Sequence, residues 1–306
     1  MKRVLFSALA VLLLFASAAA AGPVSVFVSI LPQKYFVEQI GGERVDVSAM
    51  VEKGRDPHVF EPLPAQMEGL SKAKAYFAVG LPFEESLLPR AASLNPGLKI
   101  YRIDEGIDKI AGGREHHDEH EDEPERNDGK HDHHVHEPHR EGADPHVWNS
   151  PREAILMAGK ILEGLTEIDP DGREEYARRH ADFVERLKTL DAEFAGMFRG
   201  RQGATFLVFH PAWGYFARSY GLVEVAIETE GKEPKAADLA NIISEARERG
   251  VKAIFLSPQF SRRSAEIVAQ AIGASVTTAD PLAAEWEENL RAVAKAIAEA
   301  IAEAAK

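Results

Sequence analysis

The sequence predicts an α/β protein with two similar lobes of parallel β-strands, joined by one long rigid helix. Short apolar runs alternate with amphipathic stretches of helical length before residue 104 and again after residue 204, and such alternation is typical of parallel βα units. Between the halves, residues 171–200 keep apolar side chains at steps of three, four and seven, as one long helix would. At 1.5 Å per residue this helix would reach roughly 40 Å, enough to join two lobes.

Both halves are expected to run as strands alternating with helices. Apolar or alternating runs predict the strands, and amphipathic stretches, several of them closed by glycine, predict the helices. The expected strands are 24–30, 44–50, 75–80, 98–103, 204–210, 222–228, 252–257 and 275–280. The expected helices are 32–42, 64–73, 83–94, 150–168, 171–200, 212–221, 234–250, 261–274 and 283–306. We expect Ser150 to cap the helix that follows it, with Pro151 in the first turn.

The first residues are typical of a secretory leader. Lys2 and Arg3 precede an apolar run of about a dozen residues and then a series of alanines, a pattern that predicts cleavage of a signal peptide. The run is short for a membrane span, and no later segment is apolar enough to be one. The expected organisation is a signal peptide at 1–21, an N-terminal lobe at 22–170, the linking helix at 171–200 and a C-terminal lobe at 201–306.

Charge and cysteine content narrow the function. The formal net charge is −13, and removal of Lys2 and Arg3 with the leader would make it −15. This charge argues against a nucleic-acid partner, which requires a basic face. The chain has no cysteine, so we expect neither a disulfide framework nor a lipid attachment point after the leader.

The tetrapeptide Asp-Pro-His-Val occurs twice and presents His58 and His146 on stiff supports. Proline fixes its own φ and pushes the preceding residue towards an extended conformation. Each preceding residue, Asp56 or Asp144, could also hold the tautomer of a histidine ring. The alternative is a chance repeat of a common turn tetrapeptide.

Two further polar residues follow strands of the second half. His210 stands in Phe-His-Pro and Asp280 in Ala-Asp-Pro, each at the end of a predicted strand. Because ligands of open α/β sheets bind at the carboxyl ends of strands, we expect His58, His146, His210 and Asp280 to face one cleft. Three imidazoles and one carboxylate suit four-coordinate Zn²⁺, and imidazole favours zinc over magnesium or calcium. Glu61 is the alternative fourth ligand, although exposed glutamate is usually a solvated acid.

Several segments together resemble the zinc-type periplasmic substrate-binding proteins of bacterial ABC metal importers, over almost the whole chain after the leader. They are DPHVFEPLPAQMEGL, DPHVWNSP, FHPAWGYFARSYGL, EGKEPKAADL, VKAIFLSPQFS and ADPL. The resemblance implies two lobes joined by a rigid helix, a metal in the cleft between them, and a partner membrane permease. It places the metal ligands at the same four residues. Some zinc members use three histidines, with water or a nearby carboxylate as the fourth ligand.

Residues 104–145 interrupt the strand and helix pattern with an acidic, histidine-rich insertion that cannot build a core. The resemblance makes such a loop, here 114–142, typical of zinc members. Ordering a flexible chain costs roughly 1–2 kcal/mol per residue, so we expect several weak, exchangeable zinc sites there. The loop would collect zinc or sense its level, and the alternative is a solvated segment without a role. Its histidines are His116, His117, His120, His131, His133, His134, His136 and His139.

We therefore expect a monomeric binding protein that captures Zn²⁺ in the periplasm and delivers it to an ABC permease. Four protein ligands would close the coordination sphere, and the chain has no HExxH segment, so we do not expect an enzyme. A carrier of Mn²⁺ or Fe²⁺ on the same fold is the first alternative. A zinc hydrolase, with Glu61 or Glu230 as a base, and a zinc buffer acting through the loop alone are the others.

Overall fold

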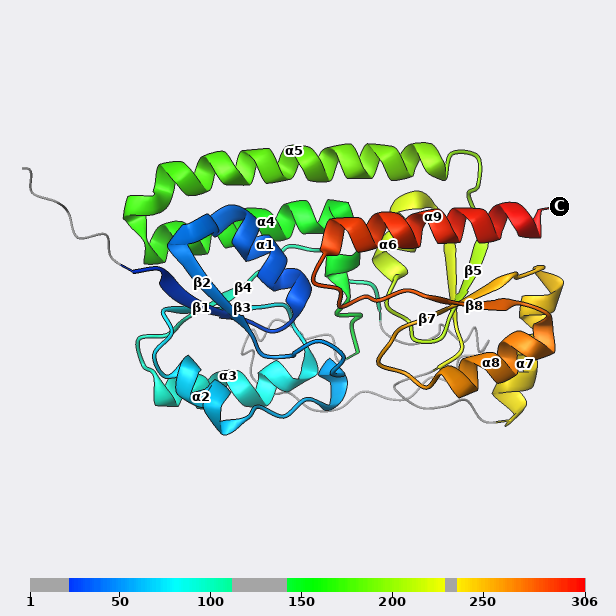
Figure 1. The fold of residues 1–306 in the computed structure, drawn as a ribbon, viewed down its shortest axis with the longest axis horizontal. Coiled ribbons are helices and arrows are strands. Elements are labelled where there is room, and N and C mark those ends of the chain that lie inside the picture. Colours follow the sequence, from blue (N-terminus) through cyan, green and yellow to red (C-terminus); the bar gives the residue numbers. More distant parts are fainter. Residues whose placement is uncertain (1–21, 112–141, 229–235, 306) are drawn as a thin grey trace, which may run out of the picture.

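The computed structural model describes residues 22–111, 142–228 and 236–305. The predicted leader and all eight histidines of the insertion lie outside these residues, as does Glu230. Figure 1 shows two lobes side by side, with one long helix running across both of them. The predicted fold class is confirmed, because each lobe is built on its own four-stranded parallel sheet.

The N-terminal lobe has a parallel sheet with strand order β2-β1-β3-β4. Its strands are β1 (Val24–Val28), β2 (Val45–Ala49), β3 (Ala75–Ala78) and β4 (Lys99–Arg102). Its helices are α1 (Leu31–Gly41), α2 (Pro64–Leu70), α3 (Pro82–Leu94) and α4 (Pro151–Ile168). Figure 1 shows α1 and α4 on one face of the sheet and α2 and α3 on the other. Both faces are thus covered, as a parallel sheet requires.

The C-terminal lobe repeats this topology with strand order β6-β5-β7-β8, again all parallel. Its strands are β5 (Thr205–Val208), β6 (Val223–Ala226), β7 (Ala253–Leu256) and β8 (Ser275–Thr278). Its helices are α6 (Gly214–Tyr220), α7 (Ala236–Glu248), α8 (Arg262–Ile272) and α9 (Trp286–Ala304). In both lobes the first strand lies between the second and the third, so the lobes share an architecture without a visible sequence repeat.

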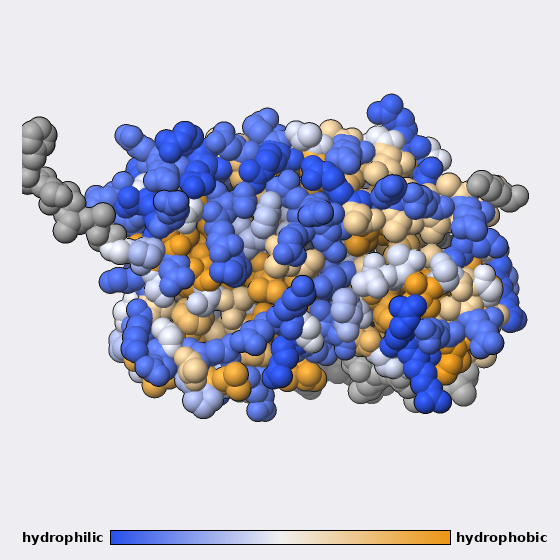
Figure 2. Space-filling model, in the orientation of Figure 1, coloured by the Kyte–Doolittle hydropathy of each residue, from blue (hydrophilic) through white to orange (hydrophobic). Residues whose placement is uncertain are grey.

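The long helix α5 (Arg173–Met197) follows a short 3₁₀ turn at Pro170–Gly172 and covers both lobes (Figure 1). It contacts α1 and α4 in the N-terminal lobe and α9 in the C-terminal lobe. Its buried side chains are apolar residues of the predicted stripe, and they are Tyr176, Phe183, Leu187, Leu190 and Phe194. The opposite side of the helix is hydrophilic (Figure 2). This amphipathic pattern explains why the helix lies on the surface and still fixes both lobes.

One apolar core runs through both lobes beneath α4, α5 and α9, and a smaller one lies between the C-terminal sheet and α7 and α8. The shared core resists a change in the angle between the lobes, because separating them would expose apolar surface. Ser150 caps α4 as predicted, since its side chain accepts a hydrogen bond from the backbone N–H of Arg152 at 3.3 Å. Among the described residues, no helix combines the length and apolar character that a membrane span needs.

Candidate metal site

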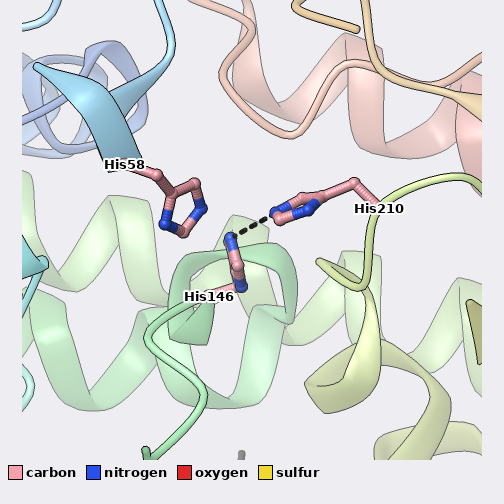
Figure 3. Close-up of side chains that lie close together, drawn as sticks. All are labelled: His58, His146 and His210. Carbon is pink, nitrogen blue, oxygen red and sulfur yellow. Dashed lines mark hydrogen bonds between the residues drawn. The ribbon is translucent and has the colours of Figure 1, made fainter. Parts of the chain in front are cut away.

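Three histidines from different parts of the chain converge where the two lobes meet. His58 lies in a 3₁₀ turn (Pro57–Val59) after β2, His146 precedes another (Val147–Asn149), and His210 follows β5 by two residues. Figure 3 shows the three rings turned towards one another. One ring nitrogen from each lies within 4.8 Å of the others, and Nε2 of His146 is 3.4 Å from Nε2 of His210. Three of the four predicted ligands are thus brought together.

These rings line a small pocket of about 10 Å³, roughly the room of one water-sized sphere. The size suits a single ion. The pocket is lined by Asp56, Pro57, His58, His146, His210, Gln259, Phe260, Pro281 and Leu282. Nε2 of His58 is buried and has no hydrogen-bond partner among the described residues. Buried polar atoms are normally paired, so this nitrogen is free to bind a ligand in the pocket.

His58 is supported through its backbone. The carboxylate of Asp56 accepts a hydrogen bond from the backbone N–H of His58 at 2.8 Å, and Pro57 stiffens the turn. Burial, together with the charges of His146 and His210, lowers the pKa of His58 to about 4. The His58 ring is therefore neutral near pH 7, which is the form that binds a metal.

His146 is supported through its ring as well. Oδ1 of Asp144 accepts a hydrogen bond from the backbone N–H of His146 at 2.9 Å and lies 2.7 Å from Nδ1 of the ring. Burial opposes ionisation of Asp144, but the charge and hydrogen bonds of His146 hold the pKa of Asp144 below its usual range. A carboxylate at Nδ1 keeps the proton there and leaves Nε2 free to bind a metal. For this pair the preceding aspartate lies at the ring nitrogen, where the predicted role requires it to be.

His210 has a carboxylate at its ring too, but one that sequence reasoning missed. Oε1 of Glu228 lies 3.2 Å from Nδ1 of His210, and Phe260 stacks on the ring with centroids 4.8 Å apart. The available signal was positional, because His210 and Glu228 end two neighbouring predicted strands. This signal can be used only when it is known that the two strands pair and which residues of the two strands lie side by side.

Asp280 is not among the residues that line the pocket. Its Oδ1 accepts hydrogen bonds from Nε2 of Gln259 at 3.2 Å and from the backbone N–H of Leu282 at 2.9 Å. Gln259 and Leu282 line the pocket, but Asp280 does not belong to the described group of donor atoms within 4.8 Å of one another. Glu61, the alternative fourth ligand, is exposed and does not line the pocket either.

The segment after His146 connects the N-terminal lobe to the two loops of the C-terminal lobe that carry His210 and Asp280. The indole N–H of Trp148 donates to the carbonyl of Pro281 at 2.7 Å, and the amide of Asn149 donates to the carbonyl of Ala212 at 2.8 Å. The indole N–H of Trp286 donates in turn to the carbonyl of Trp148 at 2.9 Å. These buried hydrogen bonds fix His146 relative to the loops that carry His210 and Asp280.

The fold and the site define a two-lobed binding protein with an imidazole-lined pocket between its lobes. Residues 26–304 match the family described as zinc-uptake complex component A, periplasmic (ZnuA), and the chain belongs to this family. This is a family of transport components and not of enzymes, in agreement with the expectation from the sequence.

Named relatives and a solved structure agree with this assignment. The chain is 28% identical over 284 residues to "Zinc-binding protein AdcA" of Streptococcus pyogenes serotype M3, covering 89% of this chain but 53% of AdcA, about half its length. It is 30% identical over 261 residues to "High-affinity zinc uptake system protein ZnuA" of Bacillus subtilis, covering 84% of this chain and 78% of that protein. A crystal structure of ZnuA aligns with a TM-score of 0.79 and 38% identity, over 91% of this chain and 99% of the other.

Proposed function

We propose that this protein captures a zinc ion with His58, His146 and His210 and carries it through the periplasm, as a monomer, to an ABC-type membrane permease. The observation that carries the proposal is the convergence of three imidazole nitrogens in one ion-sized pocket. The names of the relatives, which describe zinc binding and zinc uptake, support zinc as the cargo.

The separation of the ring nitrogens fits a bound zinc ion. Nε2 of His146 and Nε2 of His210 are 3.4 Å apart. Two nitrogens bound at about 2.0–2.1 Å to one tetrahedral zinc ion would lie about 3.3–3.4 Å apart. The ion could therefore enter between these two rings without moving them, and His58 would complete a face of three nitrogens.

The donor set favours zinc over manganese or iron. All three converging donors are imidazoles, whereas manganese prefers more oxygen ligands. We propose Asp280 as the fourth ligand. Both hydrogen bonds that the described residues give its carboxylate go to Oδ1, so Oδ2 could turn towards the ion. A water molecule in the fourth position is the alternative.

Zinc titration of the chelator-stripped protein against a competing indicator tests the proposal. We expect one tight site in the wild type. His146→Ala and His210→Ala should each weaken it by more than the roughly 10–100-fold that loss of a supporting residue costs. Asp280→Asn should weaken it less than either histidine variant does. The same titration with Mn²⁺ and Fe²⁺ should show weaker binding than with Zn²⁺. If Mn²⁺ binds more tightly than Zn²⁺, the cargo is manganese and the proposal of zinc is wrong.

A further inference from the structure

We propose that Glu228 is a positioning residue that fixes the ring of His210 so that its Nε2 faces the metal. The inference rests on the proposed metal site, but it concerns a residue that does not itself reach the pocket. The contact is made at the far side of the ring, where Oε1 of Glu228 lies 3.2 Å from Nδ1.

The parallel pairing of β5 and β6 brings the two residues together. Thr205 pairs with Val223 and Val208 pairs with Ala226, a constant offset along the two strands. Beyond the strands the same ladder continues, because Ile227 and Glu228 donate backbone hydrogen bonds to the carbonyls of Val208 and Phe209 at 3.0 and 2.9 Å. Register-matched residues of paired strands lie on the same face, so Glu228 stands beside His210.

The environment of Glu228 makes a purely structural role a poor explanation. The residue is 3% exposed, and burial of a carboxylate is costly unless it is paired. Among the described residues, no lysine or arginine nitrogen lies within 4.0 Å of it, and its one ion-pair partner is His210. A dication bound at the other side of that ring would supply the missing positive charge.

The arrangement repeats what Asp144 does for His146. In both cases a carboxylate stands at Nδ1, partly buried at Asp144 and buried at Glu228, and the two Nε2 atoms face each other across 3.4 Å. A carboxylate that accepts the Nδ1 proton sets the tautomer and raises the ability of Nε2 to bind a metal. We infer that the rings of His146 and His210 are oriented before the metal binds, each by a carboxylate at its Nδ1.

Two substitutions separate orientation from charge. Glu228→Ala removes both the hydrogen-bond acceptor and the negative charge, whereas Glu228→Gln keeps an acceptor oxygen and loses the charge. We expect Glu228→Ala to weaken zinc binding by about 10–100-fold, and Glu228→Gln to recover part of that loss. The measurement is zinc titration against a competing indicator, beside the visible absorption spectrum of the Co²⁺-loaded protein, which reports the geometry of the ligands. The Co²⁺ spectrum of Glu228→Ala should differ from that of the wild type.

Glu84→Gln is the matched control. Glu84 is a buried carboxyl of the N-terminal lobe that accepts hydrogen bonds from Ser29, Val79 and Gly80 and touches none of the three histidines. We expect this variant to lose stability while zinc affinity and the Co²⁺ spectrum stay unchanged. Wild-type affinity and spectrum in a folded Glu228→Ala protein would overturn the inference. Absence of tight zinc binding in the wild type, or an unaffected His210→Ala variant, would instead overturn the proposed site.

Discussion

The two copies of Asp-Pro-His-Val have the same sequence but different surroundings. In both, the aspartate accepts a hydrogen bond from the backbone N–H of the histidine. Only in the second copy does it also reach the ring, where Asp144 lies 2.7 Å from Nδ1 of His146. The valine of the first copy, Val59, is 78% exposed, whereas Val147 is completely buried.

The difference shows what the tetrapeptide determines and what the rest of the fold determines. Proline and the preceding aspartate fix a local turn in both copies. The orientation and burial of the ring depend on what packs against the turn. Trp148 and Asn149 bind the second copy to the C-terminal lobe, whereas His58 has a buried Nε2 without a partner among the described residues. In the proposed site His146 is therefore the histidine whose ring is fixed before metal binds, and His58 is the one whose position should depend most on the metal.

The largest effect that we expect from this comparison is a loss of stability of the metal-free protein in acid, caused by His58. Its folded-state pKa, about 4, lies below the ordinary value of 6.5, so the unfolded chain binds a proton first as the pH falls. The contribution of neutral His58 is present above pH 6.5 and is lost between pH 6.5 and pH 4, to the extent of about 3 kcal/mol.

Urea unfolding at pH 7 and at pH 4 measures this contribution. His58→Gln has no titrating ring, so it should lose less stability than the wild type over the same range. Equal losses in both proteins would show that His58 is not desolvated in the folded state.

The next effect distinguishes the two aspartates. Asp144→Asn removes the charge at Nδ1 of His146 and should weaken zinc binding by about 10–100-fold. Asp56→Asn removes a charge from the pocket lining but keeps an acceptor for the backbone N–H of His58 and breaks no ring contact, so it should weaken zinc binding less than Asp144→Asn does. Competitive zinc titration of both variants checks this, and equal losses would mean that both copies support their histidines in the same way.

Much of the fold could be predicted from the sequence because it is determined locally. Apolar runs of strand length, helical stripes and the cap at Ser150 carry their signals within a few residues. The two sheets and α5 therefore agree with the expected elements apart from shifts of a few residues at their ends. The three histidines could be predicted because each follows a strand or a stiff turn.

The supports of those histidines could not be predicted, because they depend on which segments meet. Glu228 stands beside His210 only through the register of β5 and β6. The indole of Trp148 reaches Pro281 across 133 residues of sequence. Asp280 ends a predicted strand as His210 does, yet its carboxylate bonds to Gln259 and Leu282. The sequence could predict that a residue lies at the end of a strand, but it could not predict the direction in which the side chain points.

We expect a smaller effect from loss of the hydrogen bond between Trp148, which follows the second Asp-Pro-His-Val, and Pro281 of the C-terminal lobe. Trp148→Phe fills a similar space but leaves the buried carbonyl of Pro281 without its donor, which should cost about 1–2 kcal/mol. Val59→Ala, in the exposed copy, should stay within about 0.5 kcal/mol of the wild type. Urea unfolding of both variants measures the difference, and an unchanged Trp148→Phe protein would contradict a fixed connection at this point.

We expect the smallest effect from removal of the histidine-rich insertion. The insertion lies just before the second Asp-Pro-His-Val in the sequence, but the contacts at its base do not depend on it. Ala111 and Ala143 form an antiparallel bridge at its base, and the backbone N–H of Asp144 donates to the carbonyl of Ile110 at 2.9 Å. Deletion of 114–142 leaves Gly112-Gly113 between the two alanines, and a two-residue glycine loop suits such a bridge.

The support of His146 should therefore survive this deletion, and the tight zinc site should keep its affinity within about twofold while weaker sites disappear. Competitive titration that counts zinc ions per chain tests both parts. If the deletion protein keeps its fold but loses the tight site, the insertion supplies ligands, and His58, His146 and His210 do not hold the ion alone. A tight site that survives the deletion but is lost in His146→Ala would assign capture to the pocket between the lobes, with the insertion as an accessory.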